Sequence, residues 1–142
     1  MLHLLKKLLS KKQFYNHEII IKPHPSTPIS EKYILGLNFK FSEKNLDILS
    51  SNVDLAIASS LTTASIDINY LGLPILIILN GATLNMTPVI ENERSIYIKT
   101  FEDLLSAVNY FSYTRVTKSL SDTIFFLDPS LDKWIKFIKN NL

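Results

Sequence analysis

The chain has 142 residues, no cysteine and a formal net charge of +2, and 46% of its residues are hydrophobic. This length is typical of one ordinary domain that buries roughly two-thirds of its unfolded surface, so we expect residues 1–142 to form a single domain. The composition excludes a disordered chain, a disulfide framework and cysteine-ligated metals, and the small net charge gives no reason to expect a nucleic-acid partner.

The N-terminal segment MLHLLKKLLSKK is rich in leucine and lysine, and we expect a helix over residues 2–14. Two interpretations are open: its leucines cover a sheet of this domain, or it lies as an amphipathic helix on a membrane surface. Lys6 and Lys7 interrupt the apolar run, which argues against a secretory signal peptide. Since no segment approaches the roughly 20 apolar residues of a transmembrane helix, we expect a cytoplasmic protein, at most peripheral to the inner face of the membrane.

The segment IIIKPHPSTP changes abruptly from apolar to polar. Residues 18–22 predict a strand that is buried on both faces, as in a parallel sheet, and Pro23 and Pro25 end it because proline offers no ladder donor. The two prolines also keep the backbone around His24 extended, so its imidazole is directed to bind a phosphate or a ribose, and Lys22 adds a positive charge. The alternative is a loop that the prolines only stiffen, with an exposed histidine.

The rest of the chain alternates between apolar runs typical of strands and amphipathic segments typical of helices. Ser42 is the expected N-cap of one helix and Thr100 of another, while Gly72 followed by Pro74 predicts the end of a third. The expected elements, in chain order, are a helix over 31–37, a strand over 38–41, a helix after Ser42, a strand over 54–58, a helix over 62–70, the strongest strand over 73–79, a strand over 95–99, a helix after Thr100 and a helix over 131–142. This alternation predicts an α/β domain with a parallel sheet.

Four hydroxyl residues in the segment SSLTT follow the strand expected at 54–58, namely Ser59, Ser60, Thr62 and Thr63. The first N–H groups of the next helix are unpaired and carry partial positive charge, so these side chains predict a phosphate site there. The alternative is that one of them only caps the helix. Asp67 lies four residues after Thr63, where it could reach a ribose hydroxyl or could simply be solvated.

In open α/β sheets, ligands bind beyond the carboxyl ends of the strands. Because parallel strands end at the same edge, we expect the loops KPHP and SSLTT to meet there. The polar loop after the strongest strand ends at this edge too, and it either touches the ligand or only water. No two histidines have the spacing of metal ligands, so no metal site is expected.

Three landmarks in this order resemble the C-terminal, donor-nucleotide half of GT-B-type glycosyltransferases: IIIKPHP, then DLAIASSLTTASIDINYLGLPILIIL, then a loop and a C-terminal helix. The chain is similar to enzymes of bacterial surface and capsular polysaccharide synthesis, including sialyltransferase-like families with an HP motif and a downstream Ser-Ser/Thr motif. The segments GATLNMTP and FFLDPSLDKW also resemble surface-carbohydrate biosynthesis proteins. The resemblance covers nearly the whole chain and implies a single Rossmann-like parallel sheet flanked by helices, a GT-B half-domain.

In HP-motif sialyltransferases, the motif histidine and the serine/threonine motif contact the phosphate and ribose of a CMP-sugar. The resemblance therefore implies that His24 holds the phosphate or ribose of a nucleotide-sugar, that the SSLTT hydroxyls share the phosphate and that Asp67 binds the ribose. It implies no cofactor other than the nucleotide-sugar donor, with a CMP-sugar as the expected one.

The acidic general base of that family, in its D/E-D/E-G motif, belongs to an acceptor-side domain that this sequence does not contain. A base must lie within hydrogen-bond reach of the acceptor hydroxyl, so no catalytic residue is predicted and the chain is expected to be incomplete for catalysis alone. Its expected partners are an N-terminal GT-B half or a second copy that packs against exposed apolar helices. Two alternatives are a nucleotide-sugar epimerase-like domain and a non-catalytic interaction module at the membrane periphery.

Overall fold

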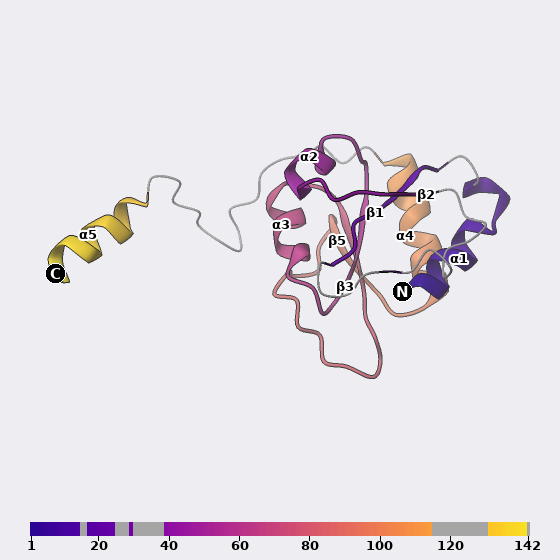
Figure 1. The fold of residues 1–142 in the computed structure, drawn as a ribbon. Coiled ribbons are helices and arrows are strands. Elements are labelled where there is room, and N and C mark those ends of the chain that lie inside the picture. The colour runs from indigo at the N-terminus through magenta and orange to yellow at the C-terminus, as the bar shows by residue number, and fades with distance from the viewer. Residues whose placement is uncertain (15–16, 25–28, 30–38, 115–130, 142) are drawn as a thin grey trace.

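The computed structural model describes residues 1–14, 17–24, 29, 39–114 and 131–141, and every structural statement below concerns these residues. The helix expected over 31–37 lies outside them. In chain order, the elements are α1 (Leu2–Leu9), the 3₁₀ helix η1 (Lys12–Phe14), β1 (Ile19–Ile21), β2 (Phe39–Phe41), α2 (Leu46–Ser50), β3 (Ala56–Ser59), α3 (Ala64–Tyr70), β4 (Ile75–Ile78), β5 (Ser95–Ile98), α4 (Phe101–Tyr113) and α5 (Asp132–Asn141) (Figure 1).

Every strand pairs with its neighbour in parallel. β1 pairs with β2, and the other three strands form a sheet in the order β3-β4-β5. This confirms the predicted α/β class with parallel strands flanked by helices. Where one sheet was expected, the described strands lie in a two-stranded and a three-stranded sheet, because β1 and β2 hydrogen-bond with each other and not with β3, β4 or β5.

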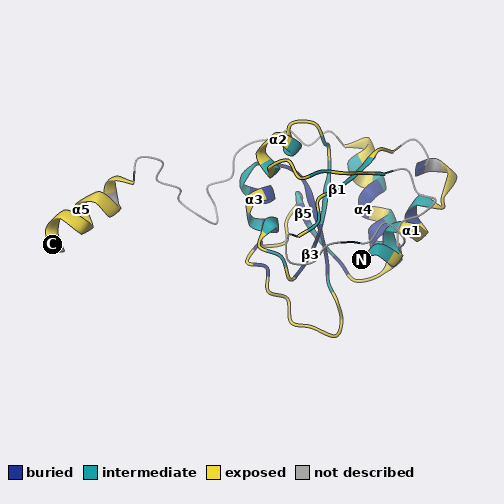
Figure 2. Cartoon of the chain, in the orientation of Figure 1, coloured by how far each residue is buried: buried dark blue, intermediate teal, exposed yellow. Residues whose placement is uncertain are grey.

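β4 is the central strand, and its side chains point alternately to two cores. Leu76 and Ile78 join the core formed with α1 and α4, whereas Ile75 and Ile77 join the core formed with α3 and the loop after β4. All four side chains are buried, so each contributes about 1.5–3 kcal/mol through removal of apolar surface from water. The predicted strongest strand is therefore confirmed, and helices cover both faces of the three-stranded sheet (Figure 2).

Two of the predicted helix boundaries are confirmed by their hydrogen bonds. Thr100 accepts from the backbone N–H of Asp103, whose side chain accepts in return from the N–H of Thr100, which is a capping box. After α3, Gly72 has a left-handed φ of 69°. Its N–H donates to the carbonyl of Asn69, and the N–H of Leu73 donates to the carbonyl of Ile68. This pair of bonds is a Schellman motif, which only glycine closes without strain.

The predicted N-cap of α2 is wrong by three residues. The helix begins after Asn45, whose backbone is extended, and the hydroxyl of Ser42 instead accepts from the N–H of Lys44 in a local turn. Serine and threonine form such turns readily, so a hydroxyl ahead of an amphipathic segment does not by itself locate the first helical residue.

The leucines of α1 cover the domain's own strands. Leu8 is buried in the core shared with α4, while Leu2, Leu5 and Leu9 face the β1–β2 sheet across a small apolar gap. The Nζ of Lys7, on the polar side of the helix, lies 4.1 Å from the centre of a ring on α4. The first of the two interpretations of this helix is confirmed, because its apolar face is already covered by the same chain.

The outer edge of β5 is closed by side chains. Alternate N–H groups of this strand and of the residue after it point away from β4, and these three donors, on Ser95, Tyr97 and Lys99, each have an acceptor. The N–H of Ser95 donates to the side chain of Asn92 at 3.0 Å, and the N–H of Tyr97 donates to the carboxylate of Glu91 at 3.0 Å. The N–H of Lys99 donates to the carboxylate of Asp103 at 3.1 Å.

Candidate functional site

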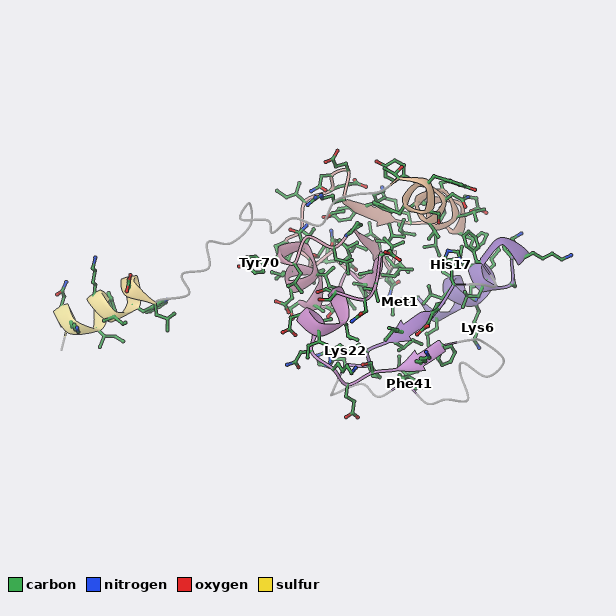
Figure 3. All side chains as sticks on the ribbon, turned by 90° about the horizontal axis from the view of Figure 1, so that it is seen from above. Met1, Lys6, His17, Lys22, Phe41 and Tyr70 are labelled. Atoms are coloured by element: carbon green, nitrogen blue, oxygen red, sulfur yellow. The ribbon has the colours of Figure 1, made fainter. Side chains whose placement is uncertain are left out.

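A shallow surface cavity, wide open to solvent and of about 400 Å³, lies where the carboxyl end of β1 meets α2 and α3. Figure 3 shows Lys22 and Tyr70 on the same side of the molecule, at the tip of β1 and on α3. The volume lies within the range of small-molecule sites. The residues that line the cavity are Lys22, Asn45, Leu46, Asp47, Asp67, Tyr70 and Leu71.

Each wall of the cavity follows from local sequence. Lys22 comes directly after the last residue of β1, and its Nζ lies 3.4 Å from the carbonyl oxygen of Glu43. Asn45 is the N-cap residue of α2. On α3, Asp67 and Tyr70 are three residues apart, and this spacing puts both on one face of the helix.

The charges of the cavity are mixed, with one ammonium group on Lys22 and two carboxylates on Asp47 and Asp67. All three residues are exposed to solvent. An ammonium group binds a phosphate as a point charge, while carboxylates accept hydrogen bonds from hydroxyl groups and the ring of Tyr70 offers a flat apolar surface. Such a set suits a ligand with many hydroxyls and one anionic group better than a polyanion, which the carboxylates would repel.

Two of the predicted site residues, Lys22 and Asp67, line this cavity together. Sequence reasoning missed Asn45, Asp47 and Tyr70. The three-residue spacing of Asp67 and Tyr70 could have indicated that the two side chains share a helix face. No local pattern links them to Asn45 and Asp47, because α2 and α3 come into contact only in the folded chain.

The SSLTT hydroxyls do not line the cavity, and two of them serve the backbone. Ser59 Oγ accepts from the N–H of Leu61 at 3.3 Å, and Thr62 Oγ1 accepts from the N–H of Ala64 at 3.2 Å. Thr63 is exposed at the N-cap position without a side-chain cap bond. Ser60 is buried, and its hydroxyl has no hydrogen-bond partner within the described part of the chain. The bond of Thr62 is a local turn one residue ahead of the N-cap, and the N-cap residue itself makes no side-chain cap bond.

A chain of hydroxyl groups ties this turn to the loop after β4. Ser65 Oγ donates to the carbonyl of Thr62 at 3.0 Å, and it lies 2.8 Å from Thr87 Oγ1, which accepts from the N–H of Val89 at 3.3 Å. A hydroxyl has one hydrogen, so the hydrogen of the 2.8 Å bond must come from Thr87. The bonds therefore run in one direction, from Val89 through Thr87 and Ser65 to Thr62.

His24 is exposed, two residues after Lys22 and immediately after Pro23. The residues that follow it, 25–28, lie outside the described part of the chain. His24 is not among the described residues that line the cavity, although its position in sequence keeps it near the tip of β1.

Among the residues that the structure describes, no group of three histidine or acidic side chains is placed to hold a metal ion. The helices described are all too short or too polar to cross a bilayer. No protein-family model, curated protein or solved structure matches the chain. The resemblance to GT-B enzymes therefore depends on the sequence motifs, and the parallel α/β fold is the part of it that the structure confirms.

Proposed function

We propose that this chain is the nucleotide-sugar-binding part of a glycosyltransferase of surface carbohydrate biosynthesis, and that the donor binds in the cavity of Lys22 and Asp67. The observation that carries the proposal is that these two residues, singled out from separate motifs 45 positions apart in the sequence, line one cavity. The parallel α/β fold supports it as well, since such folds bind ligands beside strand ends.

The charges of the cavity favour a donor with one phosphate. Lys22 is the cation that meets this phosphate, and Asp67 and Asp47 accept hydrogen bonds from ribose or sugar hydroxyls. A second phosphate would add negative charge beside two carboxylates, so a CMP-sugar fits the cavity better than a UDP- or GDP-sugar. Tyr70 provides a surface on which a base or sugar ring packs.

In a transfer reaction, the nucleotide phosphate leaves as the acceptor hydroxyl attacks the anomeric carbon. A cation already in place at the phosphate stabilises this charge as it develops, which is the role we assign to Lys22. No carboxylate of the described residues is assigned as the base. We therefore expect the chain to bind a nucleotide without turning it over.

Titration of the isotope-labelled chain with CMP, UDP and GDP, followed by NMR, tests this proposal. We expect amide shifts at the cavity residues, with CMP binding most tightly. Lys22→Ala should weaken CMP binding by tenfold or more, since a hydrogen bond to a charged group is worth about 1.5–3 kcal/mol. Asp67→Asn should weaken it less, and Lys44→Ala, which removes the same charge from an exposed position outside the cavity, should not weaken it.

The proposal is wrong if no nucleotide shifts the cavity amides, or if Lys22→Ala and Lys44→Ala weaken binding equally. Shifts confined to Ser59, Ser60, Thr62 and Thr63 would place the nucleotide at the SSLTT turn instead and would refute the cavity as the donor site.

A further inference from the structure

The C-terminal helix α5 is amphipathic and stands apart from the rest of the described chain (Figure 1). Its apolar residues Leu131, Trp134, Ile135 and Ile138 follow the i, i+3, i+4, i+7 spacing of a single helical stripe. All four are exposed, Trp134 to 64%, and none of them belongs to either core. Within the described part of the chain, no layer covers this apolar helix face, in contrast to the buried Leu8 of α1.

The polar side of α5 is basic. Lys136 and Lys139 lie off the apolar stripe and are exposed, and the acidic residue of the helix, Asp132, is in its first turn. Trp134 stacks edge-on against Phe137, with 6.3 Å between the ring centres. A short helix with tryptophan and aliphatic residues on one face and lysines beside it has the composition of helices that lie in the membrane interface.

We propose that α5 binds the surface of an anionic lipid bilayer, with Trp134, Ile135 and Ile138 inserted among the acyl chains. Lys136 and Lys139 then reach the headgroups, since lysine can bury its methylene stem while its ammonium group stays in water. Ten residues of helix are about 15 Å long, too short to span a bilayer, so the helix lies in the plane of the interface.

The lysines favour a bilayer over a protein partner. Lysine is depleted from protein–protein interfaces, whereas the surface potential of anionic lipid attracts it. α1 is less suited to this role, because Leu8 is buried in the core with α4, Leu4 and Leu9 pack against that core, and Leu2 and Leu5 face β1–β2 across a small gap.

Trp134 makes the proposal directly measurable, since it is the single tryptophan of the sequence. We expect its emission to shift to shorter wavelength when the full chain meets vesicles of phosphatidylcholine mixed with phosphatidylglycerol, and to shift less with phosphatidylcholine alone. The protein should sediment with the mixed vesicles, and added salt should release it.

Two pairs of variants separate the two faces of the helix. Ile138→Glu should abolish co-sedimentation, whereas Leu84→Glu, at a loop position that is 81% exposed, should leave it unchanged. Lys136→Glu should weaken binding by at least about fivefold, the effect expected from losing one lysine at an anionic surface. Lys44→Glu, the same charge reversal outside the helix, should have no effect.

The proposal is overturned if mixed vesicles cause neither a shift of the emission nor co-sedimentation. It is also overturned if the emission shifts without lipid as the protein concentration rises, because a second copy would then cover the stripe. Nucleotide titration of Ile138→Glu distinguishes this proposal from the function of the cavity, which the variant should leave intact.

Discussion

The hydroxyl chain from Val89 to Thr62 leads to a quantitative prediction. Thr87→Val keeps the shape of the side chain and removes two bonds, the one from Val89 and the one to Ser65. Ser65→Ala also removes two bonds, the one from Thr87 and the one to Thr62. A buried hydrogen bond contributes about 1 kcal/mol net, so each variant should lower the free energy of unfolding by about 2 kcal/mol.

The two variants share one bond, and this makes the prediction sharp. The double variant loses three bonds and should be destabilised by about 3 kcal/mol, not by the sum of about 4 kcal/mol. The coupling energy of about 1 kcal/mol is then the contribution of the 2.8 Å bond between Thr87 and Ser65.

Urea unfolding of the four proteins, followed by circular dichroism, measures these quantities. Thr83→Val serves as a control, because its exposed hydroxyl makes only a local bond of 3.4 Å in the same loop. If the two substitutions prove additive within about 0.3 kcal/mol, the side chains do not interact and the directional chain is refuted.

Three further predictions concern caps and cores. Gly72→Ala forces an L side chain to a φ of 69° and should lower the free energy of unfolding by about 1–2 kcal/mol. Gly81→Ala is the control and should leave the free energy of unfolding unchanged, because its new Cβ would meet no atom within 4 Å. The urea midpoints of the two variants measure the difference. Hydrogen bonds from the backbone N–H groups of Thr100 and Lys99 lower the pKa of Asp103 below its ordinary 3.8, so its stabilising effect is full above pH 3.8 and is lost as the pH falls through the lowered value. The stability difference between the wild type and Asp103→Asn should therefore shrink in acid, and an equal difference at every pH would contradict this account. Leu104→Ala should cost about 2–5 kcal/mol because Leu104, on α4, is fully buried in the core with Leu76, and a smaller loss in thermal unfolding would mean that this core is loosely packed.

Features that depend on near neighbours in the sequence could be predicted. The run LPILIIL is uniformly apolar and forms the buried central strand. Thr100 with Asp103, and Gly72 after α3, have the side chains and backbone freedom that caps require within three or four residues. In each case the interacting groups lie within a few residues of one another, so the local sequence pattern is sufficient to predict the interaction.

Features that depend on residues far apart in the sequence could not be predicted. The bond between Ser65 and Thr87 joins side chains 22 residues apart, so the packing of the turn after β3 against the loop after β4 could not be predicted from a local pattern. Likewise, Lys22 follows β1, Asp47 lies on α2 and Asp67 lies on α3, so only the folded chain brings these three side chains to one cavity.

The closed edge of β5 has a consequence for how this protein associates with itself. An exposed edge strand is a template on which another chain can add a strand, and this is a common start of aggregation. Each outward N–H group of β5 already has a side-chain acceptor, and the acceptors Glu91 and Asp103 are acidic groups that would also repel a second copy of the same edge. The outer edge of β5 therefore offers a second copy of this chain no N–H group that is still without an acceptor, and strand addition is disfavoured there.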